Sequence, residues 1–336
     1  MSRTRLDALP EPSDRTPPVV TRKMPSIGLA LGGGGARGLA HIVMLEAFDE
    51  LGLRPKIVAG TSIGAIMGAA YASGIPASVM RAHTRDLLTQ RFGLMREVFA
   101  ERPLQRLRGL FSGSSSLFDA EAVLDLIMPK GIAADFESLP IPLKIVASDF
   151  YDQEAQVFTS GSLRTAVAAS MALPAIFKPV VVNNKALIDG GLTNPLPYDL
   201  LLGEADIVVA IDVSGAPVPD PRRNYPSAVE ALFASAFLFE RTIVREKLKS
   251  QQPDILVPAG TSHFQVLDIM KVDEIMAAAE PAKEKLKAQL ARILSVETLP
   301  QLAASTPVTL ISTEDQPPKS KKRGLLTRRK GRAGKG

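Results

Sequence analysis

Short apolar segments alternate with longer segments of helical periodicity along most of this chain. The first apolar segment, Ile27 to Leu31, is followed by a glycine loop and then by apolar residues at helical spacing from Gly38 to Leu51. The order repeats with a strand expected at Ile57 to Ala59 and a helix from Ile63 to about Ser73. Apolar strands that alternate with helices predict an α/β fold, in which βαβ units surround a parallel sheet.

The same pattern continues further along the chain. We expect more strands at residues 143–147, 157–158, 180–182, 186–188 and 207–212, a helix near 162–170, and helical structure from about 227 to 294. Residues 93–116 are irregular and basic, which suggests a mobile cover or connection. The predicted organisation is a flexible leader at 1–25, one domain at 26–298 and a disordered basic tail at 299–336.

Composition excludes several kinds of chemistry. The chain of 336 residues has no Cys, so it cannot contain disulfides, thiolate zinc sites, iron–sulfur clusters or a cysteine nucleophile. The 3 His residues leave little material for a metal centre, and we expect neither a metal nor a cofactor. No apolar segment reaches the roughly 18 to 20 residues that span a bilayer, and the first 25 residues lack the apolar core of a signal peptide. These features predict a cytoplasmic protein.

The net charge of +5 is concentrated at one end of the chain. Residues 316–336 hold nine Lys or Arg and no acid, and residues 1–25 hold five basic and three acidic residues. The 26 basic and 32 acidic residues that remain give residues 26–315 a charge of −6. We do not expect a nucleic-acid partner, because this main part is acidic and no aromatic residues lie among the charges of the tail.

The segment Gly60-Thr61-Ser62-Ile63-Gly64 is a G-x-S-x-G motif between a predicted strand and a predicted helix. Such a turn holds a serine in a tight elbow, with its hydroxyl exposed at the N-terminus of the helix, where negative charge is stabilised. This pattern makes Ser62 a candidate nucleophile. A glycine-bounded turn with Ser62 as a helix cap is the alternative interpretation.

Four consecutive glycines open the segment 32–38, which reads Gly-Gly-Gly-Gly-Ala-Arg-Gly. Glycines cost backbone entropy in folding, so their number indicates that bare N–H groups face an anion or an oxyanion. Gly33, Gly35 and Gly38 also match the dinucleotide fingerprint G-x-G-x-x-G, but that site requires an acid at the end of the next strand. Here the nearest acids, Asp49 and Glu50, lie in the intervening helix. A purely structural tight turn is the third possibility.

Asp189-Gly190-Gly191 follows the predicted strand 186–188. We expect this carboxylate at the functional edge of a parallel sheet, near Ser62, where it can act as a base. An aspartate that only caps a turn is the alternative. A Ser62, Asp189 and His263 triad would have the chain order of α/β-hydrolases, but no glycine or strand-end signal surrounds His263. A dyad of Ser62 and Asp189 needs no histidine.

These three motifs, in this order, resemble those of the patatin-like phospholipase family, particularly its bacterial members. The segment from Gly161 to Ser170, followed by Pro174, Phe177 and Pro179, is similar to the part of the family that precedes the aspartate. Ala147-Ser148-Asp149 is similar as well. The resemblance extends over residues 26 to 280.

The resemblance implies a three-layer α/β/α fold with a mainly parallel central sheet. It further implies a serine hydrolase that cleaves acyl esters of phospholipids or neutral lipids through an acyl-enzyme, without a metal. A slow or inactive family member that regulates or scaffolds at the membrane surface is the alternative function. The implied site consists of Ser62 as nucleophile, Asp189 as proton acceptor, Gly33, Gly34 and Gly35 as oxyanion donors, and Arg37, Gly38, Gly60, Gly64, Gly190 and Gly191 as supporting residues.

The tail from Lys319 to Lys335 supports two hypotheses. It is either a solvated extension or a segment attracted to anionic lipid at the inner face of the membrane, at roughly 1 kcal/mol per basic residue near the surface. The membrane hypothesis predicts that deletion of residues 316–336 reduces co-sedimentation with anionic vesicles. Unchanged sedimentation of the truncated protein would contradict it.

Overall fold

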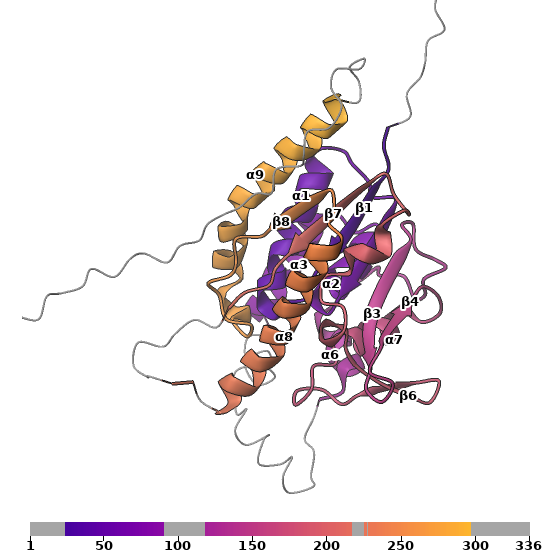
Figure 1. The fold of residues 1–336 in the computed structure, drawn as a ribbon, viewed down its shortest axis with the longest axis vertical. Helices are drawn as coiled ribbons and strands as arrows, with labels where there is room; N and C mark the ends of the chain where they lie inside the picture. Colours follow the sequence, from indigo (N-terminus) through magenta and orange to yellow (C-terminus); the bar gives the residue numbers. More distant parts are fainter. Residues whose placement is uncertain (1–23, 91–117, 217–224, 227, 297–336) are drawn as a thin grey trace, which may run out of the picture.

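A computed structural model describes residues 24–90, 118–216, 225–226 and 228–296 of the chain (Figure 1). The predictions for the leader, for residues 93–116 and for the tail, including Lys319 to Lys335, concern residues outside these ranges, apart from residues 24 and 25. The described part is built on one sheet of eight strands. Its strand order is β5-β6-β3-β2-β1-β7-β8, and β4 also pairs with β3.

Five neighbouring strands of this sheet, β3, β2, β1, β7 and β8, are parallel, whereas β4, β5 and β6 join by antiparallel pairing. The mainly parallel sheet expected from the sequence is therefore confirmed. The strands are β1 (Ile27–Leu31), β2 (Ile57–Thr61), β3 (Leu143–Asp149), β4 (Ala155–Phe158), β5 (Val180–Val182), β6 (Lys185–Asp189), β7 (Ile207–Asp212) and β8 (Ile255–Pro258).

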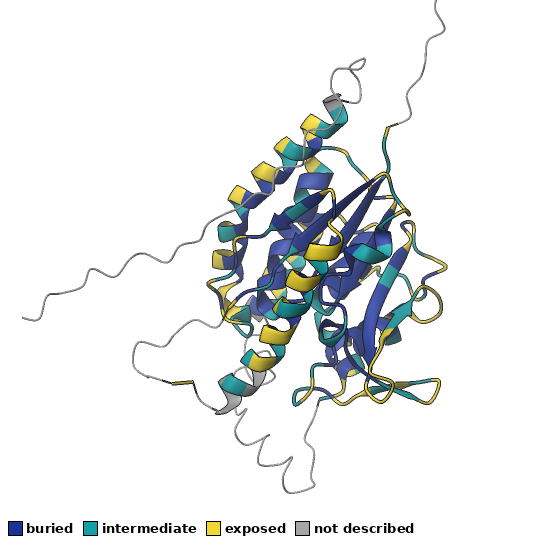
Figure 2. Cartoon of the chain, viewed as in Figure 1, coloured by how far each residue is buried: buried dark blue, intermediate teal, exposed yellow. Residues whose placement is uncertain are grey.

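Helices cover both faces of the sheet, which confirms the three-layer α/β/α arrangement (Figures 1 and 2). The larger core joins one face to α1 (Ala40–Glu50), α2 (Ile63–Ala72), α3 (Ala77–Gln90), α6 (Ala120–Ile127), α7 (Leu163–Ser170) and α9 (Val272–Val296). The smaller core joins the other face to α8 (Ala228–Ser250) and the short 3₁₀ helix η3 (Pro197–Leu201). Three further 3₁₀ helices are η1 (Gly35–Leu39), η2 (Gly190–Leu192) and η4 (Ile269–Lys271).

The two faces of β1 carry side chains of different size. Large residues Ile27, Leu29 and Leu31 enter the larger core, while Ala30 enters the smaller one. At Gly28, on the same face as Ala30, an added Cβ would lie 3.2 Å from the Cβ of Ala205. Small side chains on this face therefore let η3 and its flanking loop pack directly on the strands, and α8 completes the layer.

One strand lies where only helical structure was expected. Between α8 and α9, residues Ile255–Pro258 form β8 and pair in parallel with β7. Pro253 follows the end of α8, where proline cannot continue a helix, and the β-branched residues Ile255 and Val257 are buried against the sheet. Two helices, α3 and α6, add to those expected. In the described ranges, no helix combines the length and the apolar character needed to cross a membrane.

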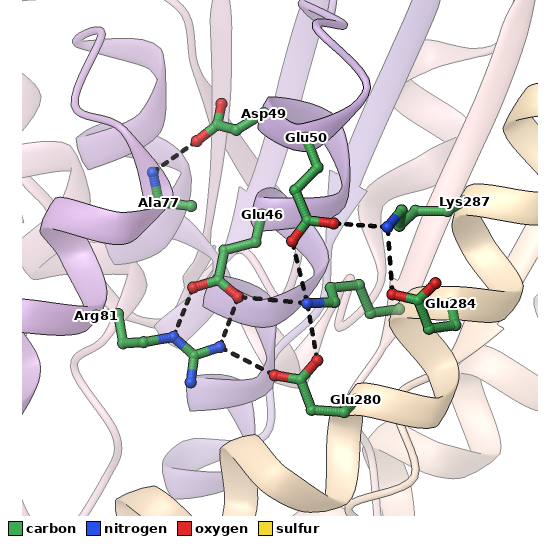
Figure 3. Close-up of polar contacts among 9 residues, drawn as sticks. Glu46, Asp49, Glu50, Ala77, Arg81, Glu280, Glu284 and Lys287 are labelled. Carbon is green, nitrogen blue, oxygen red and sulfur yellow. Dashed lines mark hydrogen bonds and ion pairs between the residues drawn. The ribbon is translucent and has the colours of Figure 1, made fainter.

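Ion pairs connect the helices α1, α3 and α9 (Figure 3). Arg81 on α3 donates from Nε and Nη2 to the two carboxylate oxygens of Glu46 on α1, at 2.5 Å each. Lys283 on α9 lies 3.1 Å from Glu50 on α1 and 2.8 Å from Glu280 on its own helix. Because Arg81 and Lys283 are largely buried, these bonds fix the relative positions of the three helices. Helix α1 in turn follows directly after the glycine-rich segment and η1.

Candidate active site

Ser62 occupies the tight turn between β2 and α2. Its backbone has φ 55° and ψ −121°, a conformation that non-glycine residues rarely adopt. An added Cβ at Gly64 would overlap the carbonyl oxygen of Leu31, and one at Gly60 would lie 2.5 Å from the Gly64 carbonyl oxygen. The two motif glycines thus permit the close approach of strand and helix that holds Ser62 in this strained position.

A second serine anchors the turn. The backbone N–H of Ser62 donates to Ser170 Oγ at 2.8 Å, and the Ser170 hydroxyl donates to the Val146 carbonyl at 2.6 Å. Ser170 is fully buried at the end of α7. It belongs to the segment that resembles the patatin-like family, but apart from its place in that segment no pattern in the sequence indicated this role.

Asp189 lies at the end of β6 and faces Ser62. The Ser62 hydroxyl donates to Asp189 Oδ2 at 2.7 Å, and the Gly191 N–H donates to Asp189 Oδ1 at 2.8 Å. Only 4% of Asp189 is exposed. At Gly190 an added Cβ would overlap the Val146 carbonyl oxygen, so the first glycine after the aspartate lets this turn pack against β3.

The strand that places Asp189 beside Ser62 runs in a different direction from the one expected. We expected the carboxyl end of a parallel strand, whereas β6 runs antiparallel to β3. The register explains the meeting, because Val146 of β3 pairs with Thr61 while the next residue, Ala147, pairs with Asp189. Asp189 therefore lies beside β3 at the level where β2 ends and Ser62 follows.

The glycine loop borders the same site, but its three predicted donors differ. The Gly33 N–H already donates to the Pro195 carbonyl at 2.9 Å, whereas in the described part of the chain those of Gly34 and Gly35 donate to no backbone group. The Arg37 Nε donates to the Gly34 carbonyl at 3.1 Å. Since C=O and N–H of a trans peptide point in opposite directions, this bond fixes the direction of the Gly35 N–H.

Arg37 is itself buried beneath this loop. Its guanidinium carbon lies 5.5 Å from the ring centre of Phe237 on α8, a cation–π distance. Burial lowers the pKa of Arg37, and the nearby acids Glu240 and Asp212 oppose this shift. Together these contacts make Arg37 a bridge between the glycine loop and α8.

A cavity of about 170 Å³ opens beside Ser62. Its polar lining consists of Ser62, Asp189, Thr84, Glu240 and the glycine loop. Glu240 was not among the predicted site residues. The rest of the lining is apolar, apart from backbone groups, and comprises Ala36, Leu39, Ile63, Ile66, Met67, Leu87, Leu88, Ile127, Met171, Leu173, Ile176, Phe177, Phe237, Val266, Leu267 and Ile269.

No histidine is among the described residues that line this cavity. His263 is exposed and packs its ring on Phe264, with ring centres 4.2 Å apart. His41 is fully buried, and its Nε2 lies 2.8 Å from the Gly32 carbonyl. Burial lowers the pKa of His41 to about 4, so it stays neutral. The geometry favours the dyad over a triad that includes His263.

The acids considered for nucleotide binding have structural partners instead. Asp49 accepts from the Ala77 N–H at 2.8 Å and so caps α3, and Glu50 pairs with Lys283 and Lys287 (Figure 3). Neither lines the cavity next to the glycine loop. Across the described residues, no three His, Asp or Glu side chains form a group that could hold a metal ion.

Burial controls the electrostatics of the two carboxyl groups in the cavity. It raises the pKa of Asp189 to about 6, although the bonds from Ser62 and Gly191 favour the charged form. It also raises the pKa of Glu240 to about 8, helped by the nearby charge of Asp189 and opposed by Arg37. Near neutral pH, Asp189 is therefore ionised and able to accept a proton, while Glu240 is protonated.

The raised pKa of Asp189 predicts a cost in stability. The folded protein binds this proton more tightly than the unfolded chain, so the free energy of unfolding falls as pH rises from about 4 to about 6, by roughly 3 kcal/mol. The Asp189→Asn variant stays neutral, and thermal unfolding followed by circular dichroism should show a higher melting temperature than wild type at pH 7. The difference should vanish near pH 4.

Asp149→Asn provides a matched control, because the pKa of Asp149 is shifted in the opposite direction to that of Asp189. The hydrogen bond from Lys185, 2.8 Å away, lowers the pKa of Asp149, so its charged form stabilises the fold above the pKa of the unfolded chain. This variant should therefore melt below wild type at pH 7, and the loss should shrink towards low pH. An Asp189→Asn variant that also melts below wild type at pH 7 would contradict the assigned electrostatics.

Comparison with known proteins places this geometry in context. An uncharacterised NTE family protein of Mycobacterium bovis is 33% identical over 204 residues, which cover 60% of this chain and 53% of that protein. The neuropathy target esterase sws of Drosophila melanogaster is 35% identical over 192 residues, covering 56% of this chain and 13% of that protein. The crystal structure of VipD from Legionella pneumophila has a TM-score of 0.44 and 14% identity, over 80% of this chain and 67% of that one.

The region matched by the family model contains the candidate site. This chain spans about half the length of the mycobacterial relative, and much less of the fly protein. The family model of patatin-like phospholipases matches residues 29–202, a range that contains the glycine loop, Ser62 and Asp189. The chain belongs to the patatin-like phospholipase family.

Proposed function

We propose that this protein is a serine hydrolase that cleaves fatty-acyl esters of lipids through an acyl-enzyme. Ser62 is the nucleophile and Asp189 is the base. The observation that carries the proposal is the 2.7 Å hydrogen bond from the Ser62 hydroxyl to the buried carboxylate of Asp189 in this cavity. The strained backbone of Ser62 supports the same role, since strain of this kind is typical of nucleophile elbows.

A lipid substrate fits the lining of the cavity. Aliphatic and aromatic side chains surround Ser62, and an acyl chain is the part of a lipid that such a surface binds. Family membership supports this choice, as does the relative from Drosophila melanogaster, which is named as an esterase. The substrate class we propose is a phospholipid, a lysophospholipid or another acyl ester.

In the first half of the reaction, Ser62 Oγ attacks the carbonyl carbon of the ester and its proton moves to Asp189 Oδ2. The negative charge that develops on the carbonyl oxygen is stabilised by the N–H groups of Gly34 and Gly35. One such donor contributes about 3 kcal/mol in hydrolases. We exclude Gly33 from this set because its N–H is bonded to Pro195. The ester C–O bond then breaks, and the leaving alcohol takes the proton from Asp189.

In the second half, water hydrolyses the acyl-enzyme. A water molecule gives a proton to Asp189 while its oxygen attacks the acyl carbon. Collapse of the intermediate releases the fatty acid, and Ser62 Oγ recovers the proton from Asp189.

Because Asp189 must be ionised at the start of each half of the reaction, the hydrolytic activity should fall below pH 6, where the pKa of Asp189 lies.

The test is hydrolysis of p-nitrophenyl butyrate by wild type, Ser62→Ala, Asp189→Asn and His263→Ala. Loss of the nucleophile should lower kcat by at least about 10³-fold, and loss of the base by about 10²- to 10⁴-fold. His263→Ala should stay within about twofold of wild type, because His263 is exposed and outside the cavity.

Two outcomes would contradict the proposal. Full activity of Asp189→Asn together with an inactive His263→Ala would make His263 the base. Turnover by wild type no faster than by Ser62→Ala, with both proteins folded by circular dichroism, would favour the regulatory or scaffold alternative.

A further inference from the structure

Glu240 is a buried acid that the mechanism above does not use. It lies on α8 and lines the cavity beside Ser62 and Asp189, with only 5% of its surface exposed. No hydrogen bond joins its carboxyl group to another described residue, so this group can bind a water or a ligand in the cavity.

The position of Glu240 places it beside the base. An added Cβ at Gly191 would lie 2.7 Å from Glu240 Oε1 and 3.1 Å from Asp189 Oδ1. The two carboxyl groups thus flank the same glycine, and the absence of a side chain at Gly191 is what leaves room for both. Asp189 and Ser62, whose hydroxyl donates to Asp189 Oδ2, line the same cavity.

The charged groups near Glu240 come from two other elements. Asp189 at the end of β6 disfavours a second negative charge, while Arg37 on η1 favours one, and Arg37 is itself influenced by Asp212 and Arg241. Burial is the largest effect, so the carboxyl group is neutral near pH 7. A neutral carboxyl group has an O–H that donates and a C=O that accepts, and it can therefore hold a water or an alcohol from either side.

The apolar lining restricts which part of a substrate can satisfy Glu240. An acyl chain offers it no hydrogen bond. The polar atoms that must come close to Asp189 are the oxygen of the leaving alcohol, which receives a proton from it, and the oxygen of the attacking water, which gives a proton to it. Hydrolysis of the acyl-enzyme is the reverse of acylation, with water in place of the alcohol. The oxygen of the attacking water therefore occupies the position of the oxygen of the leaving alcohol. Glu240 lines the same cavity, on the Oδ1 side of Asp189.

We propose that Glu240 holds the leaving alcohol during acylation and the attacking water during hydrolysis of the acyl-enzyme. This inference rests on the proposed hydrolase function. In the second step, one O–H of the water points to Asp189 and transfers its proton there, while the other donates to the Glu240 carbonyl oxygen. The water oxygen then forms the new bond to the acyl carbon as the bond to Ser62 Oγ breaks. Glu240 gains and loses no proton.

The test separates hydrolysis of the acyl-enzyme from its formation. Wild type, Glu240→Leu and Glu240→Gln are mixed with p-nitrophenyl butyrate, and rapid mixing records the burst and the steady rate. Intact-mass measurement after an acid quench gives the fraction acylated. Labelling of Ser62 by a fluorophosphonate is timed separately, because its fluoride leaving group needs no proton and the reaction needs no water.

Glu240→Leu should hydrolyse its acyl-enzyme about tenfold more slowly, the change that one lost hydrogen bond in the transition state produces. Its acylated fraction should rise, while the rate of fluorophosphonate labelling stays within about threefold of wild type. Glu240→Gln keeps a donor and an acceptor in the same place, and it should restore hydrolysis to within about threefold. Glu246→Leu, at an exposed position on the same helix, is the matched control and should match wild type.

Three outcomes would overturn the inference. Hydrolysis by Glu240→Leu at the wild-type rate would show that Glu240 does not hold the water. Equal slowing of labelling and hydrolysis would indicate that Glu240 only supports the architecture, as would a Glu240→Gln variant as slow as Glu240→Leu. Wild type that gives neither acyl-enzyme nor label would instead remove the proposed function, and the inference with it.

Discussion

The candidate site depends on one steric constraint, the close approach of backbone segments at the ends of β1 and β2. Helix α2 begins so near to β1 that only a glycine fits at position 64, against the Leu31 carbonyl. This approach forces Ser62 into a positive φ and exposes its hydroxyl to the cavity. A similar constraint acts at Gly190, which packs on the Val146 carbonyl and sets the position of Asp189. The two turns meet because β3 pairs with β2 on one side and with β6 on the other.

Burial then gives these groups their chemical character. Asp189, Glu240 and Arg37 share an interior that is otherwise apolar, and each has a pKa displaced towards its neutral form. For Asp189 the displacement increases its strength as a base near neutral pH, at a cost in folding free energy. Functional sites commonly contain such costs, which the core must offset. The larger core lies on one side of the sheet, and its helices α1, α3 and α9 are also joined by ion pairs.

Local patterns in the sequence predicted the strands and turns that carry Ser62 and the glycine loop, because those features depend on neighbouring residues. The meeting of Ser62 with Asp189 depends on strand register across 127 positions, and the antiparallel direction of β6 has no local signature. Glu240 is one of 35 acidic residues and lies on a helix that reaches the site only through tertiary packing. The bond between Gly33 and Pro195 is equally long-range, so the sequence could not separate Gly33 from Gly34 and Gly35 as donors.

If Ser62 is a nucleophile activated by Asp189, mass spectrometry after treatment with a fluorophosphonate should show one adduct per chain. Peptide fragmentation should locate this adduct on Ser62, and the Asp189→Asn variant should be labelled much more slowly. An adduct on another residue would refute this assignment. So would folded wild-type protein that remains unlabelled, or an Asp189→Asn variant that labels as fast as wild type.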